Sequence, residues 1–191
     1  MTAFSYPQRL LTLSDFVALP EDDRHRWELQ EGVLVVSPSP TPAHNIAGAQ
    51  LYMQLFAQLP DDLVAVPDVD VDLGLVPPDE PATVRRPDLI VVTRAELERV
   101  RTSGGILRTS EAVLVVEIVS PGSRRTDTVT KRSEYAEAGI AHYWIIDLNE
   151  PLSLLVFRLT EELGYLDEGE ATGTFRTTSP CPLTIELGRL G

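Results

Sequence analysis

Cysteine and lysine each occur only once in this 191-residue sequence, as Cys181 and Lys131. One cysteine can form neither an internal disulfide bond nor a cluster of thiolate metal ligands. Long apolar runs are missing too, since the longest uninterrupted aliphatic segment, residues 112–116, is far shorter than a membrane span. The first residues contain no basic region followed by an apolar stretch, so we predict no secretory signal. We therefore expect a cytoplasmic protein without membrane association.

The composition is that of an ordinary folded protein. Hydrophobic residues make up 43% of the chain and charged residues 24%, which excludes a disordered chain and suits one domain over residues 1–191. The net charge of −13 is opposite in sign to that of a typical nucleic-acid-binding protein. Residues 85–132 nevertheless carry ten basic and six acidic side chains, a local charge of +4. This segment either meets an anion such as phosphate or reflects chance clustering on solvated loops.

The hydrophobic pattern predicts an α/β (α+β) fold with a mixed sheet, a helix on each face and β additions at the C-terminus. Helices are expected over 13–19, capped near Ser14, and over 43–59, 94–100 and 127–138, the last with Asp127 as its cap and Gly139 as its end. An N-terminal β-hairpin is expected from strands 26–30 and 33–36, with Gly32 in the turn. Further strands are expected over 68–73, 88–92, 112–119, 143–146 and 152–157.

Glu117 interrupts an apolar run, residues 113–119, that reads as a strand buried on both faces. A glutamate is almost never fully buried unless it is paired or bound to a metal ion, because desolvation penalises its charge. One interpretation is a structural ion pair between Glu117 and an arginine near the strand end. The other is a functional carboxylate.

Asp88 is the first residue of another apolar run, directly after Pro87. It either makes a turn or stands beside Glu117, if the two runs are neighbouring strands. Two adjacent carboxylates repel each other unless a cation joins them, and Mg²⁺ is bound by one or two carboxylates with waters and phosphate oxygens. The second arrangement therefore predicts a site for Mg²⁺ or Mn²⁺.

Lys131 and Tyr135 lie one turn apart on the helix expected after Asp127. A lysine near a helix N-terminus is unfavourable unless carboxylates or a phosphate face it; the alternative is a solvated lysine.

Glu28, in the first hairpin, is either a half-exposed strand residue or a functional carboxylate. His44, at the start of the long helix, is a ligand, a base or a polar first-turn residue.

These residues occur within six motifs whose order resembles that of the Uma family of bacterial proteins. The resemblance spans roughly residues 10–160, and the motifs are Trp27-Glu28-Leu29-Gln30-Glu31-Gly32, His44, Arg86-Pro87-Asp88, residues 116–121, Asp127-x3-Lys131-x3-Tyr135 and Gly139-x3-Tyr143-Trp144-Ile145-Ile146-Asp147. The family is assigned to the PD-(D/E)xK restriction-endonuclease-like superfamily, which implies a mixed β-sheet flanked by helices. That superfamily usually has a lysine two residues after its second carboxylate, where this sequence has Val119. The family pattern supplies a lysine from the following helix instead, and Lys131 fills that position.

The resemblance implies a metal-dependent endonuclease that hydrolyses phosphodiester bonds, with DNA as the expected substrate. Asp88 and Glu117 would hold Mg²⁺ or Mn²⁺, Glu28 would assist, and Lys131 would orient or activate the attacking water. His44 and Tyr135 are secondary candidates. Arg86, Arg124 and Arg125 are the candidate nucleic-acid-binding residues. The alternative is a non-catalytic interaction or regulatory module of the same fold, acting as a homodimer.

Overall fold

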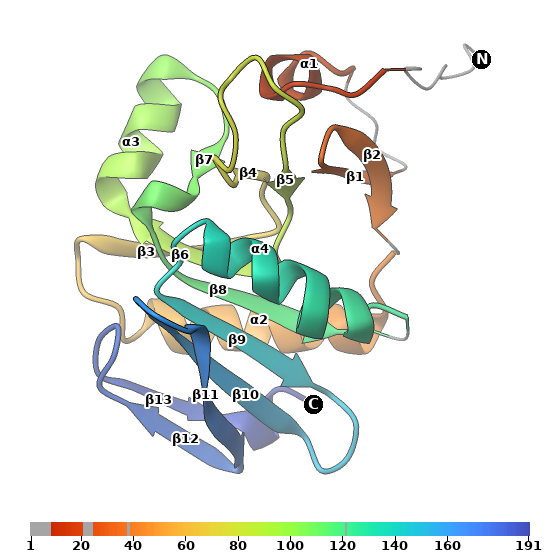
Figure 1. Ribbon diagram of the computed structural model, residues 1–191. Coiled ribbons are helices and arrows are strands. Elements are labelled where there is room, and N and C mark those ends of the chain that lie inside the picture. Colours follow the sequence, from red (N-terminus) through yellow and green to blue (C-terminus); the bar gives the residue numbers. More distant parts are fainter. Residues whose placement is uncertain (1–8, 21–24, 38, 121) are drawn as a thin grey trace.

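The computed structural model describes residues 9–20, 25–37, 39–120 and 122–191. Its larger sheet has six strands in the order β11-β10-β9-β8-β6-β3 (Figure 1). Only β8 and β9 pair in parallel, and the other neighbours are antiparallel. The strand bounds are β3 Leu63–Pro67, β6 Leu89–Thr93, β8 Ala112–Val119, β9 His142–Asp147, β10 Ser153–Thr160 and β11 Gly164–Thr172.

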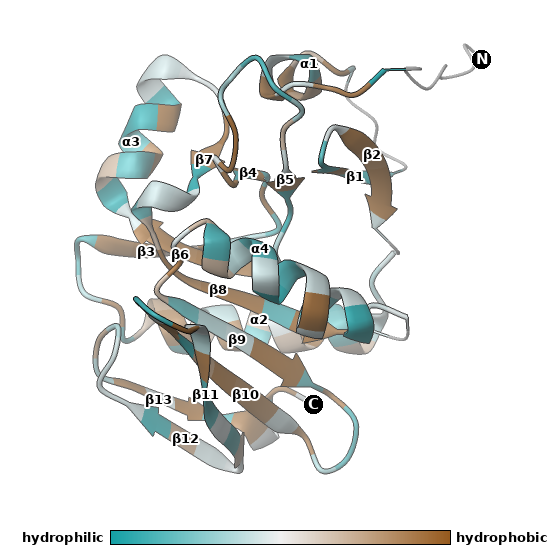
Figure 2. Ribbon diagram, in the orientation of Figure 1, coloured by the Kyte–Doolittle hydropathy of each residue, from teal (hydrophilic) through white to brown (hydrophobic). Residues whose placement is uncertain are grey.

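Helices and a small hairpin cover the two faces of this sheet. Trp144 and Ile146 of β9 face helix α2 (Pro42–Phe56) and the hairpin of β12 (Thr174–Thr177) and β13 (Leu183–Glu186). Tyr143 and Ile145 face the opposite side, where helix α4 (Arg132–Glu137) packs. Because both faces are covered, β6, β8 and β9 are almost entirely apolar, as Figure 2 shows.

A second sheet lies at the α1 end of the molecule (Figure 1). Its strand order is β2-β1-β5-β4-β7, and it has its own core, in which Phe16, Trp27 and Leu29 are buried. The bounds are β1 Arg26–Gln30, β2 Val33–Ser37, β4 Val71–Asp72, β5 Val84–Arg85 and β7 Leu107–Arg108, with helices α1 Leu13–Val17 and α3 Arg94–Ser103 beside them. Short 3-10 turns occupy Thr109–Glu111 and Leu187–Arg189.

This architecture confirms the predicted α+β class, the mixed sheet flanked by helices, the N-terminal hairpin and the C-terminal strands. The strands are divided among several sheets rather than one. No helix within the described ranges is both long enough and apolar enough to cross a lipid bilayer.

Several predicted elements differ from the structure in their bounds. The strand expected over 68–73 is reduced to β4, and Asp68 at its start has a left-handed backbone, φ 51°, that a strand residue does not adopt. Helix α1 is capped by Thr12, not near Ser14, through a reciprocal capping box with Asp15. Strands β3, β5 and β7 were not expected. Two-residue strands such as β5 and β7 contain too few residues to show any periodicity.

The helix expected over 127–138 also begins differently. Residues Thr126–Lys131 form a π-helical turn, η2, that continues into α4, and Asp127 lies inside it and makes no cap hydrogen bond. Asp127 was therefore wrongly predicted to be the helix cap. Gly139, with φ 77°, follows the end of α4 as expected.

Candidate active site

The structure brings Asp88 and Glu117 together at the junction of β6 and β8. These strands pair antiparallel with Leu89 opposite Val116, so Asp88 stands opposite Glu117. Asp88 Oδ2 accepts a hydrogen bond of 2.6 Å from the backbone N–H of Ile118. Both carboxylates line one small cavity of about 60 Å³. Neighbouring strands thus carry the two candidate metal ligands to a shared space.

Glu117 is the buried carboxylate at the centre of this cluster, and its side chain is 4% exposed. Its Oε1 accepts hydrogen bonds from Lys131 Nζ at 2.9 Å and from the Tyr135 hydroxyl at 2.7 Å. Burial raises the pKa of Glu117 to about 8; Lys131 opposes this rise, and the charges of Asp88, Asp127 and Glu28 add to it. The structural interpretation required an ion pair between Glu117 and an arginine. Among the described residues, Glu117 pairs with Lys131 and with no arginine.

Lys131 is buried among three carboxylates rather than solvated. Its Nζ lies 2.9 Å from Glu117 Oε1, 3.3 Å from Glu28 Oε1 and 3.7 Å from Asp127 Oδ1. Burial by itself would lower the pKa of Lys131, but the three carboxylates together raise it. Lys131 consequently keeps its proton, and it provides a fixed positive charge instead of a base.

The π-helical turn η2 delivers Asp127 and Lys131 to the cavity. Both side chains are buried, and α4 then adds Tyr135 from the next turn. Burial raises the pKa of Asp127, while Lys131 lowers it. Single π-helical turns are rare and occur frequently at functional sites.

Glu28 is held by a buried arginine that the sequence pattern did not reveal. Arg85 is 1% exposed, and its Nη1 donates to Glu28 Oε2 at 2.9 Å. Its Nε and Nη2 donate to the carboxylate of Glu134 on α4, at 2.7 and 2.6 Å. Burial of Glu28 raises its pKa, but Lys131 and Arg85 lower it by more. A buried Glu28 needs a basic partner, but the sequence does not identify it as Arg85, which lies 57 residues away.

The mouth of the cavity holds His44, Arg26 and Arg86. His44 Nε2 lies 3.2 Å from Asp88 Oδ2, and this hydrogen bond raises the pKa of the imidazole. Arg86 Nε lies 3.1 Å from Asp68 Oδ1, and Arg26 Nη1 lies 2.9 Å from the same oxygen. Both arginine side chains are about one-third exposed, and they form the positive rim of an otherwise acidic site.

Most of the positive segment over residues 85–132 is used for local ion pairs. Arg99 and Arg108 bind Glu96, and Arg101 binds Glu98, all on or beside α3. Arg124 pairs with Asp147 at the surface. Arg125 is exposed and has no ion pair among the described residues. The segment is therefore not one continuous phosphate-binding surface, and the candidates Arg124 and Arg125 stand outside the lining of the small cavity.

The donor set suits a cation held by two carboxylates. Within the described part of the chain, no group of three or more His, Cys, Asp or Glu side chains forms a ready metal cluster. The hydrogen bonds that these two carboxylates accept from described residues all go to Asp88 Oδ2 and Glu117 Oε1. The other oxygen of each carboxylate accepts no hydrogen bond from the described residues. The cavity of about 60 Å³ has room for a hydrated ion, since one water needs roughly 10–15 Å³. Mg²⁺ and Mn²⁺ fit this arrangement.

Comparisons with known proteins give the family and the fold of the chain. The model of the Uma2 family, described as "Putative restriction endonuclease", matches residues 13–180. A crystal structure described as "a putative nuclease belonging to DUF820 from Anabaena variabilis" is similar in fold, with a TM-score of 0.66 and 21% sequence identity. The match covers 94% of this chain and 97% of that one. No curated protein sequence matches the chain significantly.

Proposed function

The chain belongs to the Uma2 restriction-endonuclease family, as its motifs indicated, and on this premise we propose that it is a metal-dependent nuclease. It would hydrolyse phosphodiester bonds of nucleic acid at the cavity lined by Asp88, Glu117 and Lys131. Asp88 and Glu117 would hold Mg²⁺ or Mn²⁺ through these other oxygens. Family membership supports a nuclease-like function, and the metal and the substrate are inferred from the chemistry of the site.

The excess of carboxyl groups over cationic groups in the buried cluster is the observation that carries the proposal. Asp88, Glu117 and Asp127 line one cavity with Lys131, and Glu28 also contacts the lysine. Arg85 divides its charge between Glu28 and Glu134. One ammonium therefore faces more carboxylates than it can neutralise. Burying uncompensated charge is costly, and a divalent cation would remove that cost.

Each side chain then has a definite task. When bound, the divalent ion would supply Lewis-acid charge to the scissile phosphate and favour ionisation of a water molecule. Lys131 remains protonated, so it would stabilise the negative charge that develops on the phosphoryl oxygens, without taking a proton. Tyr135 and Lys131 orient Glu117, and His44 and the Ile118 N–H orient Asp88. Glu28 contacts the Lys131 ammonium at 3.3 Å and would help to position it.

Titration with Mn²⁺ and a cleavage assay with oligonucleotides test this assignment. Glu117→Gln and Asp88→Asn remove one charge each with almost no change in volume, and both should abolish Mn²⁺ binding and cleavage. Glu168→Gln removes the same charge at an exposed ion pair with Arg158 and should leave both unchanged. A wild-type protein that binds no Mn²⁺ and cleaves no nucleic acid would favour the non-catalytic module instead.

Lys131→Met separates the lysine from the metal ligands. The substitution keeps the length of the side chain and removes its charge, so Asp88 and Glu117 should still bind Mn²⁺. Cleavage should slow by about 100-fold or more, the scale for losing one electrostatic stabiliser. Unaltered cleavage by a folded Lys131→Met protein would remove Lys131 from the mechanism.

A further inference from the structure

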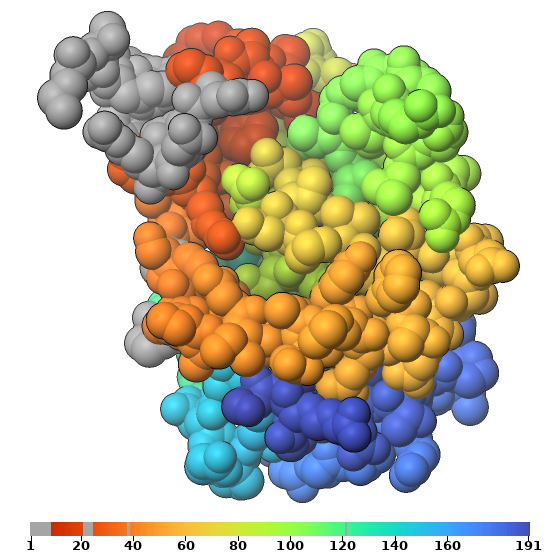
Figure 3. Space-filling model, turned by 180° about the vertical axis from the view of Figure 1, so that it is seen from behind, coloured from red at the N-terminus to blue at the C-terminus, as the bar shows by residue number. Residues whose placement is uncertain are grey.

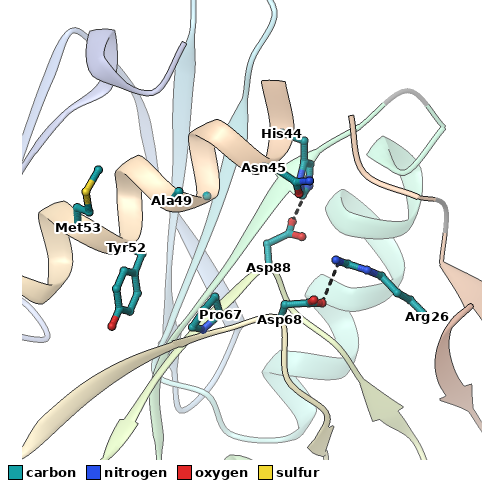
Figure 4. A pocket seen from close by; sticks show the side chains of 10 residues that line it. Arg26, His44, Asn45, Ala49, Tyr52, Met53, Pro67, Asp68 and Asp88 are labelled. Atoms are coloured by element: carbon teal, nitrogen blue, oxygen red, sulfur yellow. Dashed lines mark hydrogen bonds and ion pairs between the residues drawn. The ribbon is translucent and has the colours of Figure 1, made fainter. Parts of the chain in front are cut away.

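A second and larger cavity, of about 380 Å³, adjoins the candidate active site. It lies between α2 and the end of β3, and Arg26, His44 and Asp88 line both cavities (Figure 4). From behind, the surface is hollowed above α2, which runs in orange below the yellow segment that follows it (Figure 3). Small-molecule sites typically have volumes of about 300–1,000 Å³. A group bound here would be next to a phosphate held at Asp88 and Glu117.

The cavity has a polar end and an apolar end. Its polar end is formed by the ion pair of Arg26 with Asp68 and by the contact of His44 with Asp88. Its apolar end is formed by Gly48, Ala49, Tyr52, Met53 and Pro67. The two carboxylates at the polar end disfavour a phosphate inside the cavity. They favour a neutral, flat group whose edge carries hydrogen-bond donors and acceptors, which describes a nucleobase.

An aromatic pair, the half-buried Tyr52 and the exposed Phe56, extends from the apolar end along α2. The rings of Tyr52 and Phe56 are one helical turn apart, with centroids separated by 5.9 Å and planes inclined at 29°. Phe56 is 68% exposed, and Met53 beside it is 53% exposed. Every nucleobase has a π-face that stacks on such rings whatever its sequence, so this pair provides a stacking surface that leads out of the cavity.

We propose that this cavity binds an unpaired nucleobase of the substrate strand, next to the phosphate at the Asp88–Glu117 site, with Tyr52 as the stacking surface. This inference rests on the proposed nuclease function and specifies its substrate class. A base in the cavity cannot also be stacked within a duplex. The preferred substrate is therefore a single strand, or a duplex in which one nucleotide at the cleavage point is unpaired.

Fluorescence anisotropy with labelled oligonucleotides in EDTA measures this binding without metal-dependent cleavage. A single strand should bind about tenfold more tightly than the same sequence as a perfect duplex. A strand with one abasic nucleotide at the recognised position should lose about tenfold in affinity, because it keeps every phosphate but lacks the stacked base. Equal binding of the duplex, or of every abasic strand, would overturn the proposal.

Substitutions at the cavity complete the test. Tyr52→Ala should weaken single-strand binding about tenfold and cancel the effect of the abasic nucleotide, whereas Tyr52→Phe keeps the ring and should bind normally. Ala49→Leu fills the cavity from an exposed helical position and should act like Tyr52→Ala without disturbing the core. If Tyr52→Ala and Ala49→Leu bind like wild type, the base lies elsewhere.

Three further outcomes separate this inference from its alternatives. The first is competition by a nucleoside monophosphate. If it displaces the labelled strand at concentrations close to its own dissociation constant, the occupant of the cavity is a free nucleotide, and the assignment to a nucleic-acid strand is overturned. Base-dependent binding without Mn²⁺ uptake or cleavage would overturn the nuclease proposal and retain the base site. Cleavage without base dependence would do the opposite.

Discussion

Arg85 shows how one buried side chain holds the site together. Its guanidinium connects Glu28 on β1 with Glu134 on α4, and Glu28 in turn contacts Lys131. The planar fork of arginine allows it to serve two carboxylates at once, which a lysine would do poorly. Arg85 thereby joins the smaller sheet to the helix that follows the proposed catalytic lysine.

Arg85→Met should lower the free energy of unfolding by about 3–5 kcal/mol, because it leaves buried carboxylates without their partner. Urea unfolding at neutral pH measures this loss. Arg101→Met removes an arginine from an exposed pair with Glu98, where the arginine side chain is 74% exposed, and should leave stability essentially unchanged. Equal stability of the two variants would show that Arg85 is structurally dispensable.

At the scale of elements, the turn of the first hairpin depends on Gly32. Its φ is +79°, and a Cβ placed there would lie 2.7 Å from Pro81 Cβ and 2.8 Å from Leu10 Cβ. The backbone N–H of Gly32 also donates to Ala82 O at 2.8 Å. A close approach of three segments, together with a left-handed backbone, thus requires glycine.

Gly32→Ala should therefore destabilise the protein by about 2–4 kcal/mol, combining backbone strain with overpacking. Gly74→Ala is the matched control, because Gly74 has φ +62° but nothing within 4 Å of the added Cβ. It should cost only the backbone strain, about 1 kcal/mol. If thermal unfolding of the two variants is identical, close contact at Gly32 contributes nothing.

Glu96 joins helix α3 to β7. Its carboxylate accepts hydrogen bonds from the side chains of Arg99 and Arg108 and from the backbone N–H of Arg108. The hydrogen bonds from Arg99 and then Arg108 lower the pKa of Glu96 from 4.5 to about 2, although burial of the carboxylate acts in the opposite direction. In the unfolded chain the carboxyl therefore takes up a proton at a higher pH than it does in the folded protein.

This difference predicts a stability loss that begins as the pH falls through 4.5 and is complete near 2. Above that window the ionised Glu96 stabilises the fold, and below it the contribution disappears. Urea unfolding across this pH range measures the free energy of unfolding. As the pH falls, it should decrease more in the wild type than in Glu96→Gln, because the glutamine has no carboxyl group to take up a proton. Parallel pH profiles for the two proteins would contradict this account.

For the whole molecule, charge distribution governs the encounter with nucleic acid. The net charge of −13 opposes long-range attraction, and local carboxylates engage most arginines of the positive segment. Arg125 is an exposed cation beside η2. Binding should consequently depend on a few phosphate contacts near the site.

We expect weak binding whose log–log salt slope is on the order of −2 for a single strand, at about −0.7 for each phosphate contact. Replacing Arg124 and Arg125 with alanine should flatten the slope in proportion to the number of phosphates that these arginines bind, while Mn²⁺ affinity stays the same. Arg101→Ala, on α3, serves as the control and should leave the slope unchanged. Anisotropy titrations over a range of salt concentrations measure the slope, and salt-independent binding would exclude a phosphate-reading cleft.

The large elements, and the anomalous residues within them, follow from the amino-acid sequence alone. Strands buried on both faces must be nearly uniform in apolar character, so β6, β8 and β9 could be predicted, and Glu117 stood out because it breaks that pattern. The order of the motifs likewise indicated the family, and its model matches residues 13–180.

The pairing of the charges, in contrast, depends on the tertiary structure. Arg85 meets Glu134 across 49 residues of sequence, and Lys131 of η2 meets Glu28 of β1. Ion pairs form between whichever groups the fold places within a few ångströms, and no spacing along the chain encodes that distance. The cavity beside Tyr52 likewise depends on the tertiary structure, because residues of α2 and the end of β3 line it together.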